Sequence, residues 1–493
     1  MSNALLIINE EAHARELSRV AEFLLKREGP TPVYFVEDRM KRFELHARLA
    51  ETTVRTVTAD DVSVSPRFKI LPTQDGRRRV LSALATAAAR LAGFLSRAGR
   101  PLQRFASVRD CLGAIERVWL IAVERDKILH RYALCDEVLS RQSYTAIVLC
   151  EDNIEFDTAA WILAARQRGI RSIIVPYTVA NTVELTEAYV FNEPLQLKAS
   201  LANRVFARWF PQWCAHHKGR SFLRTNVVRI AAIELLGLAP PNPFLLNSGT
   251  ADAIAVESVA MHDYYREAGI PGEQLVMTGT LVDDLMFEIK AGAAGRRRAL
   301  LEENGLPLDR PILLCAFPPD QGVFDRPGCD FRDFDDMIDY WGRRLGEVRG
   351  WNVIVARHPK TRPGRLDAMR QFGLTLTDRD TASIVPLCDL YVASVSATIR
   401  WAIACGKPVL NYDAYRLDFQ DYPGIEAVVW SNTRKEFERT LRAATTDATH
   451  FARLQAAQHR EAPRWGFHDG RSGRRLQALL NGDPFERPDA GHG

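Results

Sequence analysis

The sequence predicts an α/β protein of two doubly wound domains, each built around a parallel sheet. Three observations lead to this fold class. Short apolar runs without polar alternation are typical of strands that are buried on both faces. Helical patterns separate these runs, and several of them end at a glycine. A second series of the same units begins near Arg310, in a chain whose 493 residues are enough for two or three domains.

The first series begins at the N-terminus with the apolar run ALLIIN. Each later strand follows a helical pattern, as in a βαβ crossover unit. The expected helices are 12–28, 158–169 and 258–268, and the expected strands are 4–9, 32–37, 146–150, 172–175, 252–256 and 274–278.

The second series repeats this alternation. Its first helix has acids in the first turn and arginines in the last, which complements the helix dipole. Since the two series join near 285–300, we expect domains at 1–287 and 288–468 and a tail at 469–493. Ligands in such folds bind at the carboxyl ends of the strands, here facing the cleft between the domains. The expected helices are 333–348 and 398–405, and the expected strands are 311–317, 352–356, 374–377, 390–393 and 408–411.

Composition excludes several classes of protein. The 65 Lys and Arg against 61 Asp and Glu leave a net charge of +4, too small for the field of a nucleic-acid binder. The 8 cysteines are scattered without a CxxC pair, which predicts a reducing compartment with neither disulfides nor a zinc site. The start MSNALLIINEE lacks a basic region and predicts a strand, and no run of about 18 apolar residues predicts a membrane span. We therefore expect a cytoplasmic protein.

The segment Arg77–Phe105 differs from the rest of the chain because it contains seven arginines and no acid. Its leucines and alanines recur at a spacing of three or four, as on one face of an amphipathic helix. Two interpretations fit. The helix packs on the core and exposes a solvated basic face, or it meets anionic lipid or an acceptor carrier, which would place the protein peripherally at the inner membrane.

Several familiar motifs are absent. The sequence contains no GxGxxG fingerprint and no GxSxG elbow, and the proline in Gly406-Lys407-Pro408 removes an amide that a P-loop needs. A run of acids with DxD spacing would suit a metal–diphosphate site, but it lies at a predicted helix start, where acids are expected anyway. We expect no metal there. The acids are Asp330, Asp333, Asp335, Asp336 and Asp339.

Polar residues at two strand ends of the second series predict an anion site. The strand NVIVA runs directly into Arg357 and then His358, Pro359 and Lys360, and such cationic groups can hold a phosphate or carboxylate. The strand DLYVA opens into three hydroxyl residues at a helix start, where backbone amides and the dipole favour an anion. We expect the two motifs on adjacent strands. The hydroxyl residues are Ser394, Ser396 and Thr398.

Two acids end a strand of the first series. Glu151 and Asp152 follow the run AIVLC, so a carboxylate there faces the expected cleft as a candidate general base. Because successive side chains of an extended segment point to opposite sides, only one of the two can do so. The alternative is an acidic helix N-terminus.

Several segments resemble a known family. The stretch His262–Met286 resembles the hinge of UDP-N-acetylglucosamine 2-epimerases and related GT-B proteins. The ARHPK segment, the SVSAT turn, Ala402–Val409 and the tail at 469–471 resemble bacterial surface-polysaccharide glycosyltransferases. The HP motif is similar to that of sialyltransferase-like and Kdo-transferase-like enzymes, which use CMP-activated acid sugars. In those enzymes an acidic D/E-D/E-G motif supplies the base; here Glu151 and Asp152 match it, with Asn153 in place of the glycine.

This resemblance implies a GT-B glycosyltransferase. The second domain would bind the nucleotide sugar, the first would bind a surface-glycan, lipid-linked or protein acceptor, and a helix from about Asp469 would cross back onto the first. Two cationic side chains and a helix N-terminus would neutralise the departing phosphate, so neither metal nor cofactor is expected. The resemblance favours a CMP-linked donor. Alternatives are a UDP-sugar 2-epimerase, whose acids are replaced here by Ile399, Arg400 and Trp401, and a catalytically silent binding subunit.

Overall fold

The computed structural model describes residues 3–27, 29–36, 54–59, 106–179, 181–419, 421–486 and 488, with only the backbone described for 106–118. The chain forms two compact units. Unit 1 comprises Met1–Ala255, Tyr265–Val276 and Leu479–Asp483. Unit 2 comprises Val256–Tyr264, Met277–Ala478 and Pro484–Gly493.

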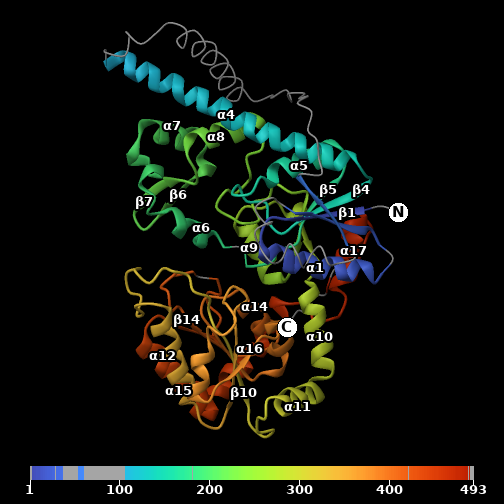
Figure 1. The fold of residues 1–493 in the computed structure, drawn as a ribbon, viewed down its shortest axis with the longest axis vertical. Helices are drawn as coiled ribbons and strands as arrows, with labels where there is room; N and C mark the ends of the chain where they lie inside the picture. The colour runs from blue at the N-terminus through green and yellow to red at the C-terminus, as the bar shows by residue number, and fades with distance from the viewer. Residues whose placement is uncertain are drawn as a thin grey trace. The chain divides into compact units, whose positions relative to one another are not determined.

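The first sheet has seven strands in the order β3-β2-β1-β4-β5-β8-β9. Its strands β1, β4 and β5 are labelled in Figure 1. The pairings from β3 across to β8 are parallel. The run from Ala4 to Ile8 is fully buried, as expected of a strand covered on both faces. The strands are β1 Asn3–Ile8, β2 Thr31–Val36, β3 Arg55–Thr58, β4 Tyr144–Leu149, β5 Arg171–Ile174, β8 Ala253–Val256 and β9 Leu275–Met277.

Helices connect these strands as crossovers. The chain winds from β1 to β2 in one direction and from β4 to β5 in the other, so right-handed crossovers place α1 and α5 on opposite faces of the sheet. The helices are α1 Glu11–Leu25, α4 Ala106–Ser140, α5 Thr158–Gln167 and α9 Val259–Glu267.

An inserted subdomain between β5 and β8 is not predicted by the sequence. It packs two of its three helices against a short antiparallel hairpin around buried Trp213 and Ile230. Arg224 is fully buried beneath it and donates to the Pro243 carbonyl (3.0 Å) and to Glu155 (2.7 Å). Its elements are α6 Thr182–Tyr189, α7 Leu201–Trp209, β6 Cys214–His217, β7 Arg220–Leu223 and α8 Val227–Leu236.

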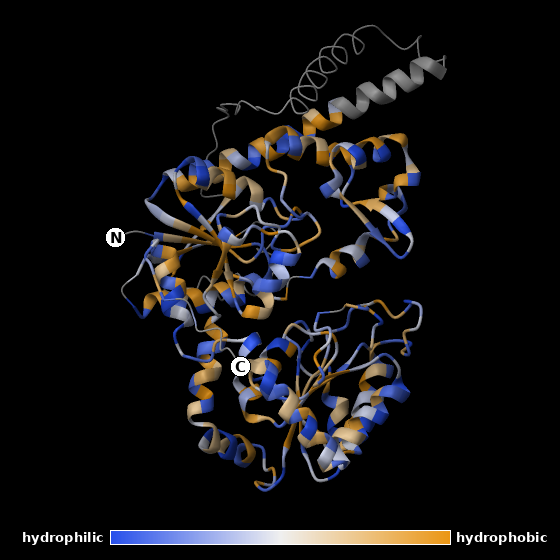
Figure 2. Cartoon of the chain, turned by 180° about the vertical axis from the view of Figure 1, so that it is seen from behind, coloured by the Kyte–Doolittle hydropathy of each residue, from blue (hydrophilic) through white to orange (hydrophobic). Residues whose placement is uncertain are grey.

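The second sheet has six strands in the order β12-β11-β10-β13-β14-β15, all paired in parallel. Figure 2 shows the strands of both sheets as mainly hydrophobic. These two parallel, doubly wound sheets confirm the predicted fold class. The strands are β10 Ile312–Ala316, β11 Asn352–Ala356, β12 Thr375–Thr377, β13 Leu390–Ala393, β14 Val409–Tyr412 and β15 Val428–Ser431.

The core of unit 2 is aromatic. Tyr412, at the end of β14, stacks on Phe437 (4.8 Å between ring centroids) and on Trp341 (5.7 Å). Trp341 and Phe437 lie on helices that begin at a side-chain cap, from Asp333 and Thr433 respectively. The helices of this unit are α10 Leu281–Ala291, α11 Ala293–Glu303, α12 Phe334–Gly346, α13 Thr381–Ile384, α14 Ile399–Ala404, α15 Arg434–Thr446, α16 Ala448–Trp465 and most of α17 Ser472–Asn481, whose last residues from Leu479 belong to unit 1.

Within the described ranges, no helix combines the length and the apolar character that crossing a bilayer requires. The arginine-rich segment Arg77–Phe105 lies outside the described residues.

Candidate functional site

Each sheet has a point at which the direction of winding reverses. In unit 1 this switch point lies between β1 and β4, and in unit 2 it lies between β10 and β13. The loops leaving two such strands diverge to opposite faces of the sheet, which opens a crevice at their carboxyl ends where α/β folds bind ligands. The candidate residues are therefore those that follow β1, β4, β10 and β13.

A histidine–carboxylate pair occupies the switch point of unit 1. His13 lies in the first turn of α1, just after β1, and Glu151 lies two residues after β4 ends. The Nε2 atom of His13 is 2.8 Å from Oε1 of Glu151, and both side chains are at most 1% exposed. A carboxylate in this position fixes the orientation and tautomer of an imidazole.

Aromatic and amide groups enclose this pair. The His13 ring lies 4.8 Å from the Tyr177 ring and 5.6 Å from the Phe156 ring, between centroids. The Asn153 side chain donates to Oε2 of Glu151. Burial raises the pKa of Glu151, and the His13 and Asn153 contacts oppose that shift. The Nδ1 atom of His13 is buried and has no hydrogen-bond partner in the described structure, so it is the ring atom left for a proton acceptor or donor role.

Asp152 points to different partners from Glu151, as alternation along an extended segment requires. Its carboxylate accepts from the backbone amides of Ser248, Thr250 (2.7 Å) and Ala251 (2.9 Å). Burial raises the pKa of Asp152, while these amides favour its charged form. Because three backbone amides of the loop before β8 occupy this carboxylate, Asp152 braces that loop.

Sequence reasoning missed His13. A lone histidine in the first turn of a helix carries no local signal. An indirect signal comes from the topology. His13 follows β1 and Glu151 follows β4, the strand at which the winding direction reverses. Because β1 and β4 are neighbours at the switch point, their carboxyl ends bring the two residues together.

In unit 2, His358 follows β11 and is half-buried, while Pro359 and Lys360 are exposed. The Lys360 amide donates to Nδ1 of His358 (3.1 Å), so the histidine shapes its own turn. Arg357 pairs with Asp378 (2.6 Å), which leaves Lys360 as the cation of this motif that has no ion pair among the described residues.

The hydroxyl residues after β13 form a local network. The Ser396 hydroxyl lies 2.7 Å from that of Thr398, which lies 2.5 Å from the Tyr391 hydroxyl. Ser394 is buried and accepts from the Ala414 amide (3.3 Å). These hydroxyls line a turn that leaves a switch-point strand, the position expected for a phosphate or ribose contact.

Val395, within this turn, has φ of +41°. A β-branched residue in the left-handed region is strained and persists where the surroundings hold it, commonly at functional turns. The Asn411 side-chain oxygen accepts from the Val395 amide (2.9 Å) and fixes this conformation.

The predicted adjacency of the two anion motifs is wrong. Strand β10 lies between β11 and β13, so the His358 turn and the Ser394–Thr398 turn are separated by one strand. With about 4.8 Å between neighbouring strands, the two motifs start roughly 10 Å apart. Only the Ser394–Thr398 turn follows a strand at the switch point, namely β13. The His358 turn follows β11, which is one strand away from the switch point.

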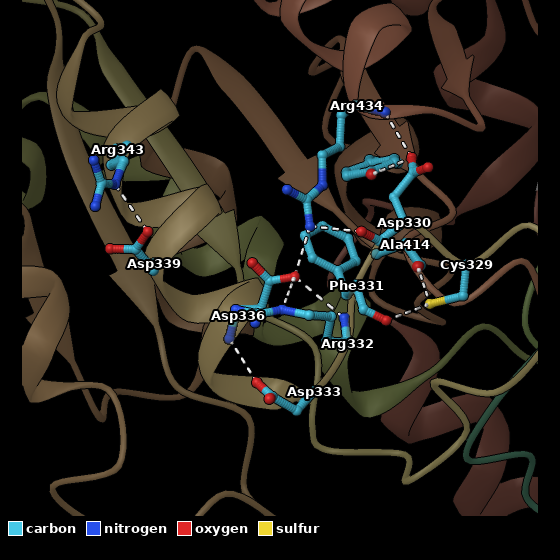
Figure 3. Close-up of polar contacts among 11 residues, drawn as sticks. Cys329, Asp330, Phe331, Arg332, Asp333, Asp336, Asp339, Arg343, Ala414 and Arg434 are labelled. Carbon is cyan, nitrogen blue, oxygen red and sulfur yellow. Dashed lines mark hydrogen bonds and ion pairs between the residues drawn. The ribbon is translucent and has the colours of Figure 1, made fainter.

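Four of the five acids in this run are held by cations and amides (Figure 3), and the fifth, Asp335, pairs with Arg365. Asp333 caps α12 through the Asp336 amide (2.8 Å). Asp330 accepts from the Arg434 amide (2.8 Å) and Asp336 pairs with the Arg434 guanidinium (2.8 Å), which lies over the Phe331 ring. Asp339 pairs with Arg343 one turn on (2.8 Å). These acids therefore join the starts of α12 and α15.

A cavity of about 770 Å³ lies elsewhere in unit 2; it contains none of the predicted catalytic or nucleotide-binding residues, and Asp469 and Arg471 of the tail at 469–471 line it. Lys290 and His468 meet at its wall, with 2.9 Å between Nζ and Nδ1. Burial, followed by the charges of Lys290 and Arg400, lowers the pKa of His468 from 6.5 to about 3.

This shift predicts a pH dependence of stability. Below pH 6.5 the unfolded chain protonates this histidine, whereas the folded chain does so only near pH 3, so stability falls as the pH decreases through that window. The free energy of unfolding should decrease between pH 7 and pH 4.5, and in His468→Gln this decrease should be smaller by about 2 kcal/mol. Urea unfolding at both pH values measures it. Equal slopes for His468→Gln and the parent would contradict the assignment.

Comparison with known proteins gives structural likeness only. No protein-family model matches the sequence, and a search of curated proteins gives no match. The chain is similar to the "S. aureus MnaA-UDP co-structure", with a TM-score of 0.46 and 13% identity over 98% of this chain and 97% of that one. It is also similar to UDP-GlcNAc 2-epimerase from Neisseria meningitidis bound to UDP-GlcNAc, with a TM-score of 0.47 and 11% identity over 97% of this chain and 99% of that one. A third similar structure is CalG4, the calicheamicin glycosyltransferase, with a TM-score of 0.49 and 11% identity over 97% of this chain and 98% of that one.

Proposed function

We propose that this protein is a metal-independent GT-B glycosyltransferase that moves a sugar from a nucleotide-activated donor to a hydroxyl acceptor. The observation that carries the proposal is the buried His13–Glu151 pair at the switch point of unit 1. A histidine backed by a carboxylate is suited to removing the proton of a hydroxyl nucleophile as that hydroxyl attacks. In this proposal the N-terminal domain, 1–287, binds the acceptor, and 288–468 binds the donor.

The roles of the residues follow from their surroundings. His13 takes the proton of the acceptor hydroxyl, and Glu151 orients the ring and stabilises its protonated form. Asp152 holds the loop before β8. His358 and Lys360, together with the hydroxyls of Ser396 and Thr398, would contact the nucleotide and neutralise the departing phosphate. Ser394 and Pro359 shape the two turns.

Metal independence rests on the partners of the acids. Asp330, Asp333, Asp336 and Asp339 accept from amides or pair with arginines, so binding a cation would require breaking those contacts. Arg400, at the position where epimerases carry acids, is buried against Asp283 (3.3 Å) and donates to the Trp465 carbonyl (3.0 Å). That contact makes Arg400 a structural residue and gives the epimerase alternative no added support.

A nucleotide screen tests the donor side. The HP motif favours a cytidine nucleotide, so CMP and CDP should raise the melting temperature more than UDP or GDP do. A response to UDP alone would overturn the cytidine preference and favour the epimerase alternative. No response to any of the four would overturn the donor site itself.

His358 gives a sharper test of the same site. We expect His358→Ala to remove most of the nucleotide-induced shift in melting temperature and to lower the unliganded stability only modestly, by about 1–2 kcal/mol, because the side chain is half-buried and the turn contact with the Lys360 amide is among the interactions lost. The matched control is His459→Ala on the exposed face of α16. A large loss of unliganded stability with an intact nucleotide response would instead show that His358 is structural.

A further inference from the structure

The cavity of about 770 Å³ in unit 2 has no part in the proposed reaction. Residues from three parts of the chain line it: Lys290 near the end of α10, Arg474 in the first turn of α17, and Phe485 after α17. Sites that enclose small molecules have volumes of about 300–1,000 Å³, so this cavity is large enough for such a ligand. Because none of the residues proposed to contact the nucleotide lines it, a ligand here would occupy a second site.

Basic side chains outnumber acidic ones on the wall of the cavity. Two of the arginines have an acidic partner, since Arg475 pairs with Asp469 and Arg471 lies 3.8 Å from Glu486. Both acids of the described wall are used in these pairs, so none remains for the other two cations. The four basic residues are Lys290, Arg471, Arg474 and Arg475.

Lys290 and Arg474 are the two cations of this wall that have no acidic partner among the residues that the structure describes. The Lys290 ammonium donates to Nδ1 of His468 (2.9 Å). Because the lowered pKa of His468 keeps its ring neutral at pH 7, this contact positions the ammonium without cancelling its charge. Two uncompensated positive charges match a phosphate monoester, whose charge is about −1.5 to −2 at pH 7.

Apolar side chains complete the wall. Phe467 is buried, and the Arg475 guanidinium lies 5.9 Å from the centre of its ring. Phe485 is half-buried, and Ala462 and Pro463 of α16 also line the cavity. An inorganic anion would leave this apolar surface without a contact, whereas the organic portion of an ester would cover it.

We propose that this cavity binds a small phosphate ester, whose phosphate contacts Lys290 and Arg474 and whose organic portion contacts Phe485. The guanidinium can bind two phosphate oxygens at once, and the ammonium adds a point charge. A free ester and a lipid headgroup share this chemistry, and vesicle binding separates the two sources. The proposal does not depend on the proposed sugar transfer.

Isothermal titration calorimetry of the full chain with phenyl phosphate tests the proposal. Phenyl phosphate should bind more tightly than inorganic phosphate, and Phe485→Ser should reduce that difference. Lys290→Gln/Arg474→Gln should lower the affinity for phenyl phosphate about tenfold or more, because two charge-assisted contacts are lost. Both side chains are exposed, so circular dichroism should show that the double variant is folded.

Sedimentation with phosphatidylcholine vesicles that contain phosphatidic acid identifies the source of the ester. Binding by the parent that Lys290→Gln/Arg474→Gln abolishes would assign the site to a lipid headgroup. Equal behaviour of the parent and this double variant, with phenyl phosphate bound by the parent alone, would assign it to a free ester.

Two controls locate the binding. Lys435→Gln/Arg442→Gln removes one lysine and one arginine that are exposed on α15, and this variant should bind phenyl phosphate as the parent does. His358→Ala should also keep the affinity, because His358 belongs to the proposed nucleotide site. No binding by the parent, or parent-like binding by Lys290→Gln/Arg474→Gln, would overturn the proposal. So would loss of binding in His358→Ala, since that result assigns phenyl phosphate to the nucleotide site.

Discussion

His13→Gln is expected to lower sugar transfer by roughly 10²–10⁴-fold while leaving the nucleotide response of unit 2 intact. Glutamine keeps a polar group beside Glu151 but cannot accept and release a proton near neutral pH. The measurement is nucleotide release per folded enzyme, with the donor identified by the thermal screen. Because His13 is fully buried, the folded fraction is determined first by near-ultraviolet circular dichroism.

Two comparisons show whether the loss is chemical. Glu151→Gln should have a smaller effect, and combining it with His13→Gln should add little, because residues that act as one catalytic unit are not additive. The second histidine–carboxylate pair of unit 1, His217 with Glu187 at 2.7 Å, supplies a control. His217→Gln should leave turnover unchanged. Full turnover by folded His13→Gln would refute His13 as the base. It would not bear on the nucleotide site, which the nucleotide screen and His358→Ala test separately.

The fold was predictable because parallel strands leave a strong local signal. Ala4–Ile8 and the run NVIVA are apolar without alternation, since both faces of such strands are covered. The inserted hairpin of β6 and β7 gives no such signal: CAHH and RSFL carry polar residues because this small sheet is partly exposed. The subdomain around it therefore could not be predicted from apolar runs.

The site was predictable only in part, because strand order is not a local property. The residues after β4, β11 and β13 were identified from strand ends alone. Which of those ends are neighbours depends on where the chain reverses its winding, and that depends on packing across the whole sheet. For this reason His358 was placed one strand too close to the hydroxyl turn, and His13 was missed although Glu151, 138 residues later, was identified.

Asp152→Ala is expected to lower the free energy of unfolding by about 4 kcal/mol, because it leaves two buried amides and one half-buried amide without an acceptor at roughly 1–3 kcal/mol each, partly offset by relaxation of the loop. These amides belong to Ser248, Thr250 and Ala251. Urea unfolding measures the loss, and turnover is then compared per folded molecule.

Asp152→Asn distinguishes this bracing role from a role as the general base. A base would lose turnover at nearly unchanged stability. A brace would instead lose about 2–3 kcal/mol, because the new amide group points a donor at backbone donors, while the folded fraction keeps its turnover. Asp157→Asn is the control, since that carboxylate is 53% exposed and makes no capping bond. A stable Asp152→Asn protein without turnover would assign proton transfer to Asp152, and His13 would then be a buried structural histidine. A destabilised but active Asp152→Asn protein would leave His13 as the base.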